Sequence, residues 1–354
     1  MGVWYATRED VMRALDSKET ARNARQIDRA LESASRGVEA LCHRTFAPTT
    51  ATKSFDWPGP QYARPWRLWL DANEVISVTT LTSGGTTIAS GDYFLEPDAY
   101  GPPYNRIEID LGSSAAFTSR DTYQRAITVT GLFGYRNDET AAGTLTAAVN
   151  SATVTTLSVN AAASALLGAG SVLRIDSERL LVTARAMADT GQNLGGSGLT
   201  AQANSVTVAV GDGTQFAMDE TILIDSERML VVDIAGNQLT VIRAWDGSVL
   251  AAHPNGANIY APRTLTVTRG ALGTIPATHA NSATVTRWDP PGPIRDLTIA
   301  ETINRLTNER AGYARTRRTG DGNSSDQAKT ARDLPGLREQ AYNSHGRKAR
   351  TRAV

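Results

Sequence analysis

The chain has one cysteine and no long apolar run, and each absence excludes a class of protein. Cys42 stands alone among 354 residues, which excludes an internal disulfide and a zinc site built from several cysteines. No apolar stretch reaches the roughly 18 residues that a membrane-spanning helix needs. The opening residues MGVWYATRED lack the apolar segment of a secretory signal peptide. We therefore expect a protein without membrane contact, used in a cytoplasm-like compartment or carried out of it within an assembly.

Net charge is also lacking, because 36 basic residues balance 36 acidic ones. The whole chain thus has no preference for nucleic acid or for acidic ligands. The balance is uneven along the sequence, since residues 305–354 hold twelve Lys or Arg and five Asp or Glu, a net charge of +7. The run GDGNSS and the scarcity of large apolar residues there favour an extended or conditionally ordered tail. Such a tail is either a solvated terminus or an arm that binds phosphates or an acidic protein groove.

Catalytic motifs are missing as well. The sequence contains no phosphate-binding glycine-rich loop, no nucleophile elbow and no Ser/His/Asp arrangement, and the glycine-rich segment 194–198 lacks the lysine of a P-loop. Cys42 lies beside the apolar face of an expected helix, where a buried thiol is the usual role. The sequence therefore predicts no catalytic residue and no cofactor, and the protein is not expected to be an enzyme.

Repeated acidic residues and histidines are the remaining candidates for chemistry. Paired carboxylates can serve as acid and base or can bind a hard cation. Because both pairs occupy the same place in a sequence repeat, we interpret them as turn residues copied together with the turn. The two histidines are also repeat equivalents, and no further ligand completes a zinc set, so no metal is predicted. The residues concerned are Asp176, Glu178, Asp225, Glu227, His253 and His279.

The N-terminal region predicts two helices. Thr7 and Asp10 form a capping-box-like start for a short helix over Arg8 to Leu15. A longer helix follows from about residue 18 to His43, and apolar residues recur along one of its faces at steps of three and four. We expect this face to pack on the sheet of its own domain. The apolar residues are Ile27, Leu31, Ala34, Val38 and Leu41, and the arginines elsewhere on the helix, expected to be solvated, are Arg22, Arg25, Arg29 and Arg36.

Short strands separated by turn residues are predicted from residue 52 to residue 130, which indicates a small antiparallel sheet. Trp57, Trp66 and Trp69 could form a ligand cage, but in so small a sheet we expect them to supply core area. After Trp288 a proline-rich linker leads into an amphipathic helix that is predicted to run from Ile294 to about Tyr313.

Residues 137–288 contain repeats and predict an all-β region of small hairpin units. The final segments of the two units look exchanged, because the repeat distance changes along the region. IDSERLLV at 175–182 recurs as IDSERMLV at 224–231, an offset of 49; LTA and NS upstream recur at an offset of 54; and residues 239–253 recur at 265–279, an offset of 26.

Four segments resemble the head-to-tail connector, or adaptor, proteins of long-tailed bacteriophages. They are YATREDV at 5–11, ALCHRTF at 40–46, ITVTGLFGYR at 127–136, and the helix entry PIR at 293–295 with Ala300 and Arg305. The resemblance covers roughly residues 1–136 and 289–354, and it rests on patterns of moderate specificity, none of them catalytic. Residues 137–288 depart from the compact members and look like accessory β modules of other phage structural proteins.

The resemblance implies an α+β fold in which a helical, small-sheet adaptor core is interrupted by an all-β repeat insertion and followed by an extended basic tail. The domains would be a core at 1–136, the insertion at 137–288, a core-completing helix at 289–315 and the tail at 316–354. The insertion would leave and re-enter the core at neighbouring points and form a separate lobe.

The implied function is structural, in the virion at the head–tail interface after assembly in the host cytoplasm. A ring, commonly of twelve copies, would sit beneath the portal protein, continue the channel for genomic DNA without sequence specificity, and bind a downstream neck or tail protein. The alternative is a tail-surface or receptor-binding protein whose β repeats carry the binding; an enzyme acting on cell-wall glycan is a weaker third class. The residues expected to contact the portal or the DNA are Arg315, Arg317, Arg318, Arg347, Lys348 and Arg350.

Overall fold

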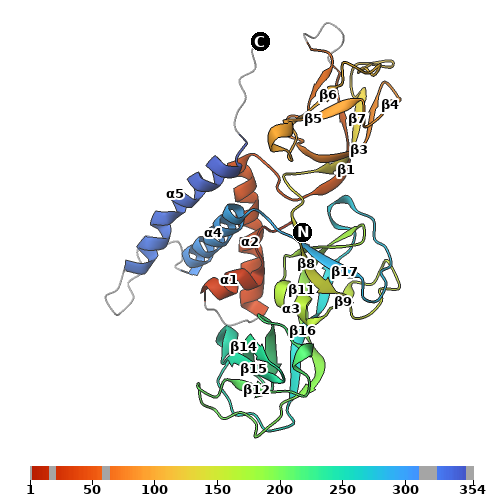
Figure 1. Cartoon of the computed structure of the whole chain (residues 1–354). Coiled ribbons are helices and arrows are strands. Elements are labelled where there is room, and N and C mark those ends of the chain that lie inside the picture. The colour runs from red at the N-terminus through yellow and green to blue at the C-terminus, as the bar shows by residue number, and fades with distance from the viewer. Residues whose placement is uncertain (1, 16–20, 58–63, 311–324, 348–354) are drawn as a thin grey trace. The chain divides into compact units, whose positions relative to one another are not determined.

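The computed structural model describes residues 2–15, 21–57, 64–310 and 325–347 (Figure 1). The chain divides into two compact units. The first unit comprises residues 1–38, 139–271 and 275–344, and the second comprises residues 39–138, 272–274 and 345–354. These divisions fall at other points than the predicted domains, because the N-terminal helices group with the β repeats.

The predicted fold class is wrong, because the chain is mostly antiparallel β-sheet, with 36% of residues in strands and 25% in helices. The region expected to be an accessory insertion forms the largest sheet, of ten strands, since its repeats join into one hydrogen-bonded ladder. Outside it the chain adds a four-stranded and a three-stranded sheet. The helices of the described residues are α1 (Arg8–Leu15), α2 (Ala21–Cys42), α3 (Ala161–Leu166), α4 (Gly292–Arg310) and α5 (Ser325–His345).

Helices from both ends of the sequence share one core in the first unit. The predicted capping box at the start of α1 is confirmed: the Thr7 amide donates to Asp10 Oδ2 at 3.0 Å, and the Asp10 amide donates to Thr7 Oγ1 at 3.1 Å. The apolar stripe of α2 is buried as expected except at Leu41, which is half-buried. The N-terminal half of the stripe packs on α1 and α4 instead of a sheet. The shared core contains Trp4, Val11, Met12, Ile27, Leu31 and Leu306.

Helix α5 occupies a segment that was predicted to be an extended tail, and that part of the fold prediction is wrong. Leu334 and Ala341 are buried, and they lie seven residues apart, on the same face of the helix. The guanidinium of Arg338 donates to Glu301 of α4 at 2.6 Å. The buried residues named here do not make a periodic apolar pattern that can be recognised in the sequence, and Pro335 lies inside the helix, where proline ordinarily interrupts one.

In sequence order, the first and the last strand of the ten-stranded sheet are neighbours in the sheet. β8 (Glu139–Thr144) pairs antiparallel with β17 (Thr284–Trp288), with Glu139 opposite Trp288. The sheet has the order β12-β15-β14-β13-β16-β11-β10-β17-β8, and β9 also pairs with β16. The other strands are β9 (Thr156–Ser158), β10 (Val172–Ile175), β11 (Glu178–Asn193), β12 (Thr207–Ala209), β13 (Thr221–Ile224), β14 (Glu227–Ala235), β15 (Gln238–Ile242) and β16 (Asn258–Thr268).

The two sequence repeats are nested, one inside the other. The outer module comprises residues 139–186 and 264–288, and the inner module comprises residues 187–263 between its two parts. Each module has its own buried apolar cluster. The long strands β11 and β16 run through both modules, so that β16 is the last strand of the inner module, paired with β13, and then pairs with β9 in the outer one.

Nesting explains why the final segments looked exchanged in the sequence. The segment after the first IDSE hairpin is interrupted by the whole inner module before the outer module resumes at residue 264. The structure also corrects the offset of 54 that was inferred for the upstream LTA and NS segments. Val149 bridges His279 as Leu199 bridges His253, so these residues are equivalent at an offset of 50, close to the 49 of the hairpins.

The second unit is built on two small antiparallel sheets around one core. The four-stranded sheet has the order β1-β7-β3-β4 and the three-stranded sheet has the order β2-β6-β5. Trp57 belongs to this core and Trp66 packs against it, as predicted. Trp69 instead lies under the guanidinium groups of Arg67 and Arg106. The strands are β1 (Thr49–Phe55), β2 (Arg67–Trp69), β3 (Val75–Ser83), β4 (Thr86–Ile88), β5 (Tyr93–Glu96), β6 (Arg106–Ile109) and β7 (Ile127–Phe133).

Candidate functional site

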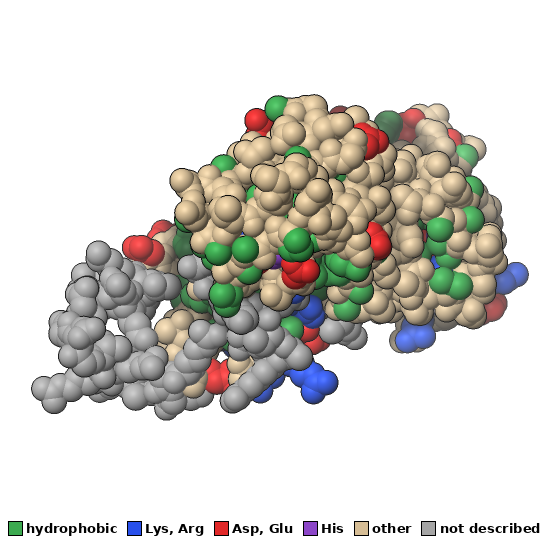
Figure 2. All heavy atoms as spheres, turned by 90° about the horizontal axis from the view of Figure 1, so that it is seen from below, with side chains coloured by type: hydrophobic (Ala, Val, Ile, Leu, Met, Phe, Trp, Pro, Cys, Tyr) green, Lys and Arg blue, Asp and Glu red, His purple; other side chains and the backbone are tan. Residues whose placement is uncertain are grey.

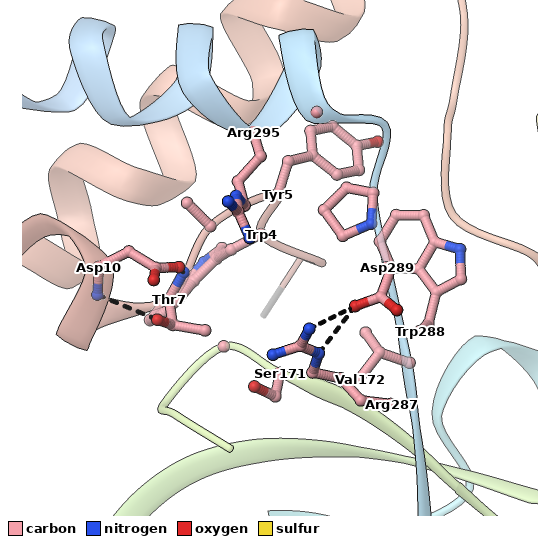
Figure 3. A pocket seen from close by; sticks show the side chains of 14 residues that line it. Trp4, Tyr5, Thr7, Asp10, Ser171, Val172, Arg287, Trp288, Asp289 and Arg295 are labelled. Carbon is pink, nitrogen blue, oxygen red and sulfur yellow. Dashed lines mark hydrogen bonds and ion pairs between the residues drawn. The ribbon is translucent and has the colours of Figure 1, made fainter. Parts of the chain in front are cut away.

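An aromatic pocket of about 260 Å³ lies in the first unit, where the segment before α1 meets the outer module and the start of α4 (Figure 3). The rings of Tyr5 and Trp288 meet edge to face with their centroids 6.0 Å apart. Trp4 is 3% exposed, and its indole Nε1, which is buried, has no hydrogen-bond partner. The pocket can therefore hold an apolar group and offers one unsatisfied donor nearby.

Charged side chains at the pocket are largely paired with one another. Arg287 donates to Asp289 at 2.8 Å through Nε and to the carbonyl of Leu166 at 2.9 Å, and Figure 3 shows the ion pair at the pocket wall. Arg295, on the first turn of α4, is exposed and lies 4.0 Å from Asp296. Thr7 and Asp10, which also line the pocket, bond each other's backbone amides as the cap of α1.

Glu9 fixes the wall of this pocket by joining α1 to the outer module. Its carboxylate accepts from the amide of Ala169 at 2.8 Å and from Nε of Arg185 at 2.9 Å. The amide of Arg8 donates to the carbonyl of Ala169 at 2.9 Å. Gly170, with a positive φ of 103°, approaches Trp4 so closely that an added Cβ would lie 2.6 Å from the indole. These contacts hold the start of α1 against the outer module, next to the pocket.

A second candidate is the pair of acidic and histidine clusters that the sequence repeat contains. In the inner clamp, defined as Asp225, Glu227, Arg243 and His253, the carboxylate of Glu227 accepts from Arg243 Nε at 2.7 Å and from Nη2 at 2.8 Å. His253 lies between two carboxylates, 2.7 Å from Asp225 and 2.9 Å from Glu227. The outer clamp, defined as Asp176, Glu178, Arg269 and His279, has the same connections.

The clamps hold the ends of two loops. Glu227 accepts from the amides of Ala244 and Ala251, and Arg243 donates to the carbonyl of Ala251 at 2.6 Å. In the outer clamp Glu178 accepts from the amides of Gly270 and Ala277, and Arg269 donates to the carbonyl of Ala277. We call residues 244–251 the inner loop and residues 270–277 the outer loop.

Each clamp glutamate is fully buried and strongly acidic. Burial favours the protonated form of Glu178, but bonds from Arg269, from the amides of Ala277 and Gly270 and from His279 outweigh it and lower the pKa to about 2. Glu227 has its pKa lowered to about 2 for the same reasons. An ionised, buried and fully bonded carboxylate is suited to holding a fold and not to proton transfer.

Asp176 and Asp225 do occupy tight turns, as predicted, with φ of 53° and 52°. The interpretation of the glutamates as turn residues is wrong, because their side chains reach Arg269 and Arg243 in the interior. Sequence reasoning missed these arginines, although both end the LTV segments that repeat at an offset of 26. Among the residues that the structure describes, no group of histidine, cysteine and acidic side chains is arranged to hold a metal ion.

The predicted tail residues are placed in part. Arg315, Arg317, Arg318, Lys348 and Arg350 lie outside the described residues. Arg347 is placed in the second unit, where its amide donates to the carbonyl of Cys42 at 2.8 Å and its guanidinium donates to the carbonyl of Ala72 at 3.0 Å. It also lies 3.5 Å from Glu74. Its role towards a portal or DNA stays a prediction.

Figure 2 shows one face of the molecule, seen from the side of β12, β14 and β15, on which acidic and basic side chains stand singly among uncharged atoms. No helix within the described parts of the chain is long and apolar enough to cross a membrane. No family model, no curated protein and no solved structure matches this chain.

Proposed function

We propose that this chain is a structural virion protein that forms an oligomeric ring between the portal vertex of a phage head and the tail, and continues the DNA channel. The observation that supports the proposal is the pairing of β8 with β17, which brings the first and last strands of the ten-stranded sheet side by side. On either side of it, α1 and α2 precede and α4 follows, and these helices share one core. The order of elements is that of the adaptor segments noted in the sequence.

The partners proposed with this function are other copies of the chain, the portal protein, a downstream neck or tail protein, and DNA passing through the channel. The pocket beside α1 is a site for an apolar side chain of one of these proteins, since Trp4, Tyr5 and Trp288 are rigidly held there. The buried, ionised clamps support a structural role over catalysis.

The alternative function is a tail-surface or receptor-binding protein. The observation that favours it is the duplication of a rigid loop, with Val249 70% exposed in the inner loop and Ile275 82% exposed in the outer loop. Apolar side chains held out on a preorganised loop bind partners at little entropic cost.

A phage that lacks this protein distinguishes between the two proposed functions. An early stop codon in the gene of the phage that encodes this chain should yield DNA-filled heads and free tails that do not join, visible by negative-stain microscopy. Supplying the protein in extract should restore joining. Complete particles that fail only to adsorb to cells would instead support the receptor-binding alternative, and complete, infectious particles would refute both.

A further inference from the structure

A lysine lies on the core-facing side of β1 in the second unit. The antiparallel register sets Lys53 opposite Val129, which is buried in the core, and residues directly opposite each other share a face of the sheet. Ala51 and Phe55, two residues before and after Lys53, pack against the same core. Lysine is among the residues that are most rarely placed inside a protein. The apolar core around Lys53 therefore does not explain its position.

The charge of Lys53 has no opposite charge beside it among the described residues. Its Nζ donates to Oδ1 of Asn73 at 2.8 Å and lies 4.6 Å from the centre of the Phe133 ring, so both partners are neutral. Burial lowers the pKa of Lys53, and no carboxylate acts against that effect. Since an ammonium group has three N–H donors, Lys53 can still donate to an incoming acceptor.

Lysine is scarce in this chain, which has four lysines and 32 arginines. Interior ion pairs are formed by arginine instead, for example by Arg44 with Glu74 and by Arg243 with Glu227. A guanidinium presents a fixed planar set of donors, whereas an ammonium is a compact point charge on a flexible stem. Frequent use of lysine thus does not account for its presence at residue 53.

A cavity of about 210 Å³ opens at Lys53, and all the residues that line it belong to the second unit. Sites for drug-sized ligands are larger, about 300 to 1,000 Å³. The cavity therefore has room for one group of about the size of a side chain. Its wall can hold a polar end and a short apolar stem, because it contains Thr45, Thr49 and Asn73 as well as Ala47, Ala72 and Phe133.

Glu74 is the acidic residue in the wall of this cavity, and its charge is already neutralised. It is 7% exposed, and its carboxylate lies 2.9 Å from Nε of Arg44 and 3.5 Å from Nη2 of Arg347. With Lys53, three positive charges stand against one negative charge, so the cavity is electropositive. Lys53 is the cation left for a ligand, which suits the single charge of a carboxylate better than the higher charge of a phosphate.

We propose that this cavity binds a carboxylate group. One carboxylate oxygen accepts from the ammonium of Lys53 and the other from the side-chain nitrogen of Asn73, and the stem of the ligand lies against Phe133. Two sources share this chemistry, namely a small free acid and an acidic side chain of a partner protein. The site goes beyond the proposed function, because it depends only on contacts within the second unit.

The test measures the binding of propionate, which has about the size of a glutamate side chain, to the full-length protein by ligand-observed NMR. Propionate should bind with a Kd of about 1 to 10 mM, as expected for so small a ligand. Propionamide is the matched neutral ligand, and it should bind about ten-fold more weakly or worse, because it lacks the charge that pairs with Lys53.

Two variants locate the binding. Lys53→Met removes the charge and keeps an unbranched stem, so propionate binding should weaken by about ten-fold or more. Its thermal midpoint should not fall, because the variant removes a half-buried charge that has no opposite partner. Arg120→Met is the matched control, since it removes an exposed cation beside Gly85, at the other end of the same sheet, and it should bind propionate like the wild type.

The pKa of Lys53 is a second readout, followed through its ammonium resonance in protein that contains isotopically labelled lysine. A carboxylate beside an ammonium favours the charged form. Saturating propionate should therefore raise the pKa of Lys53, and propionamide should leave it unchanged.

Capped tripeptides distinguish the two sources of the carboxylate. If Ala-Glu-Ala binds at least as tightly as propionate and Ala-Gln-Ala does not, the cavity accepts an acidic side chain of a protein. If propionate binds and neither peptide does, the cavity takes a small free acid.

Four outcomes overturn the inference. They are equal binding of propionate and propionamide, no saturation by propionate below about 100 mM, undiminished binding by Lys53→Met, and a loss of binding in Arg120→Met as large as in Lys53→Met. Each is independent of the stop-codon experiment, which tests whether the chain joins heads to tails.

Discussion

Removing the charge of one clamp glutamate should destabilise the inner module by about 3 kcal/mol. Glu227→Gln keeps the shape of the side chain and removes the ion pair with Arg243, which is itself buried. A pKa lowered from 4.5 to about 2 corresponds to about 3 kcal/mol of preferential binding of the ionised form in the folded state. Leaving a buried arginine without its partner costs a similar amount, of about 3 to 5 kcal/mol.

The sign of the pH dependence follows from the direction of the change. Since folding lowers the pKa of Glu227, its contribution is fully present above about pH 4.5 and is lost as the pH falls towards about 2. The wild type should therefore lose stability over that interval. Over the same interval the unfolding free energy of the Gln variant should fall by about 3 kcal/mol less than that of the wild type.

This effect is measured by unfolding the full chain in urea and monitoring the transition of the inner module. Asp233→Asn is the matched control, because it removes an exposed acid from β14, the strand that Glu227 begins, and should change the unfolding free energy by less than about 0.5 kcal/mol. Glu178→Gln should destabilise the outer module by a similar amount, and the two effects should add because the clamps share no residue. A loss below about 1 kcal/mol for Glu227→Gln at pH 7, or the same pH dependence in the variant and the wild type, would refute the reasoning.

Three further predictions follow from the described contacts and the proposed tail. Trp4→Phe keeps a smaller aromatic ring and removes the unpartnered Nε1, so in thermal unfolding it should cost less than Trp4→Ala, which should cost about 3 to 5 kcal/mol. Gly273→Ala should destabilise the second unit in urea unfolding more than Gly236→Ala destabilises the first, since both have positive φ but an added Cβ meets Thr50 only at residue 273. If the tail docks on the portal, replacing its arginines and lysine by Gln while keeping Arg347 should lower head–tail joining in extracts without changing Tm; unchanged joining contradicts that role. The replaced residues are Arg315, Arg317, Arg318, Lys348 and Arg350.

Features that depend on residues close in sequence could be predicted. The helix over Arg8–Leu15 and its capping box follow from side chains three residues apart, and the tight turns at Asp176 and Asp225 follow from local backbone chemistry. The burial of the α2 stripe follows from its period, although not the identity of the surface that it packs on. That surface is made of α1 and α4, and α4 lies more than 250 residues further along the chain.

The sequence by itself determined the local elements, the repeats and the absence of clustered cysteines. The tertiary structure decided which repeat lies inside the other, because the pairing of β11 with β16 joins segments that are about 80 residues apart. It also decided the partner of each clamp glutamate. Alternating threonines at 50 and 52, 80 and 82, and 128 and 130 show the same limit, because they are visible in the sequence but strand order alone makes them neighbours. Strand order depends on long-range pairing, which no local pattern encodes.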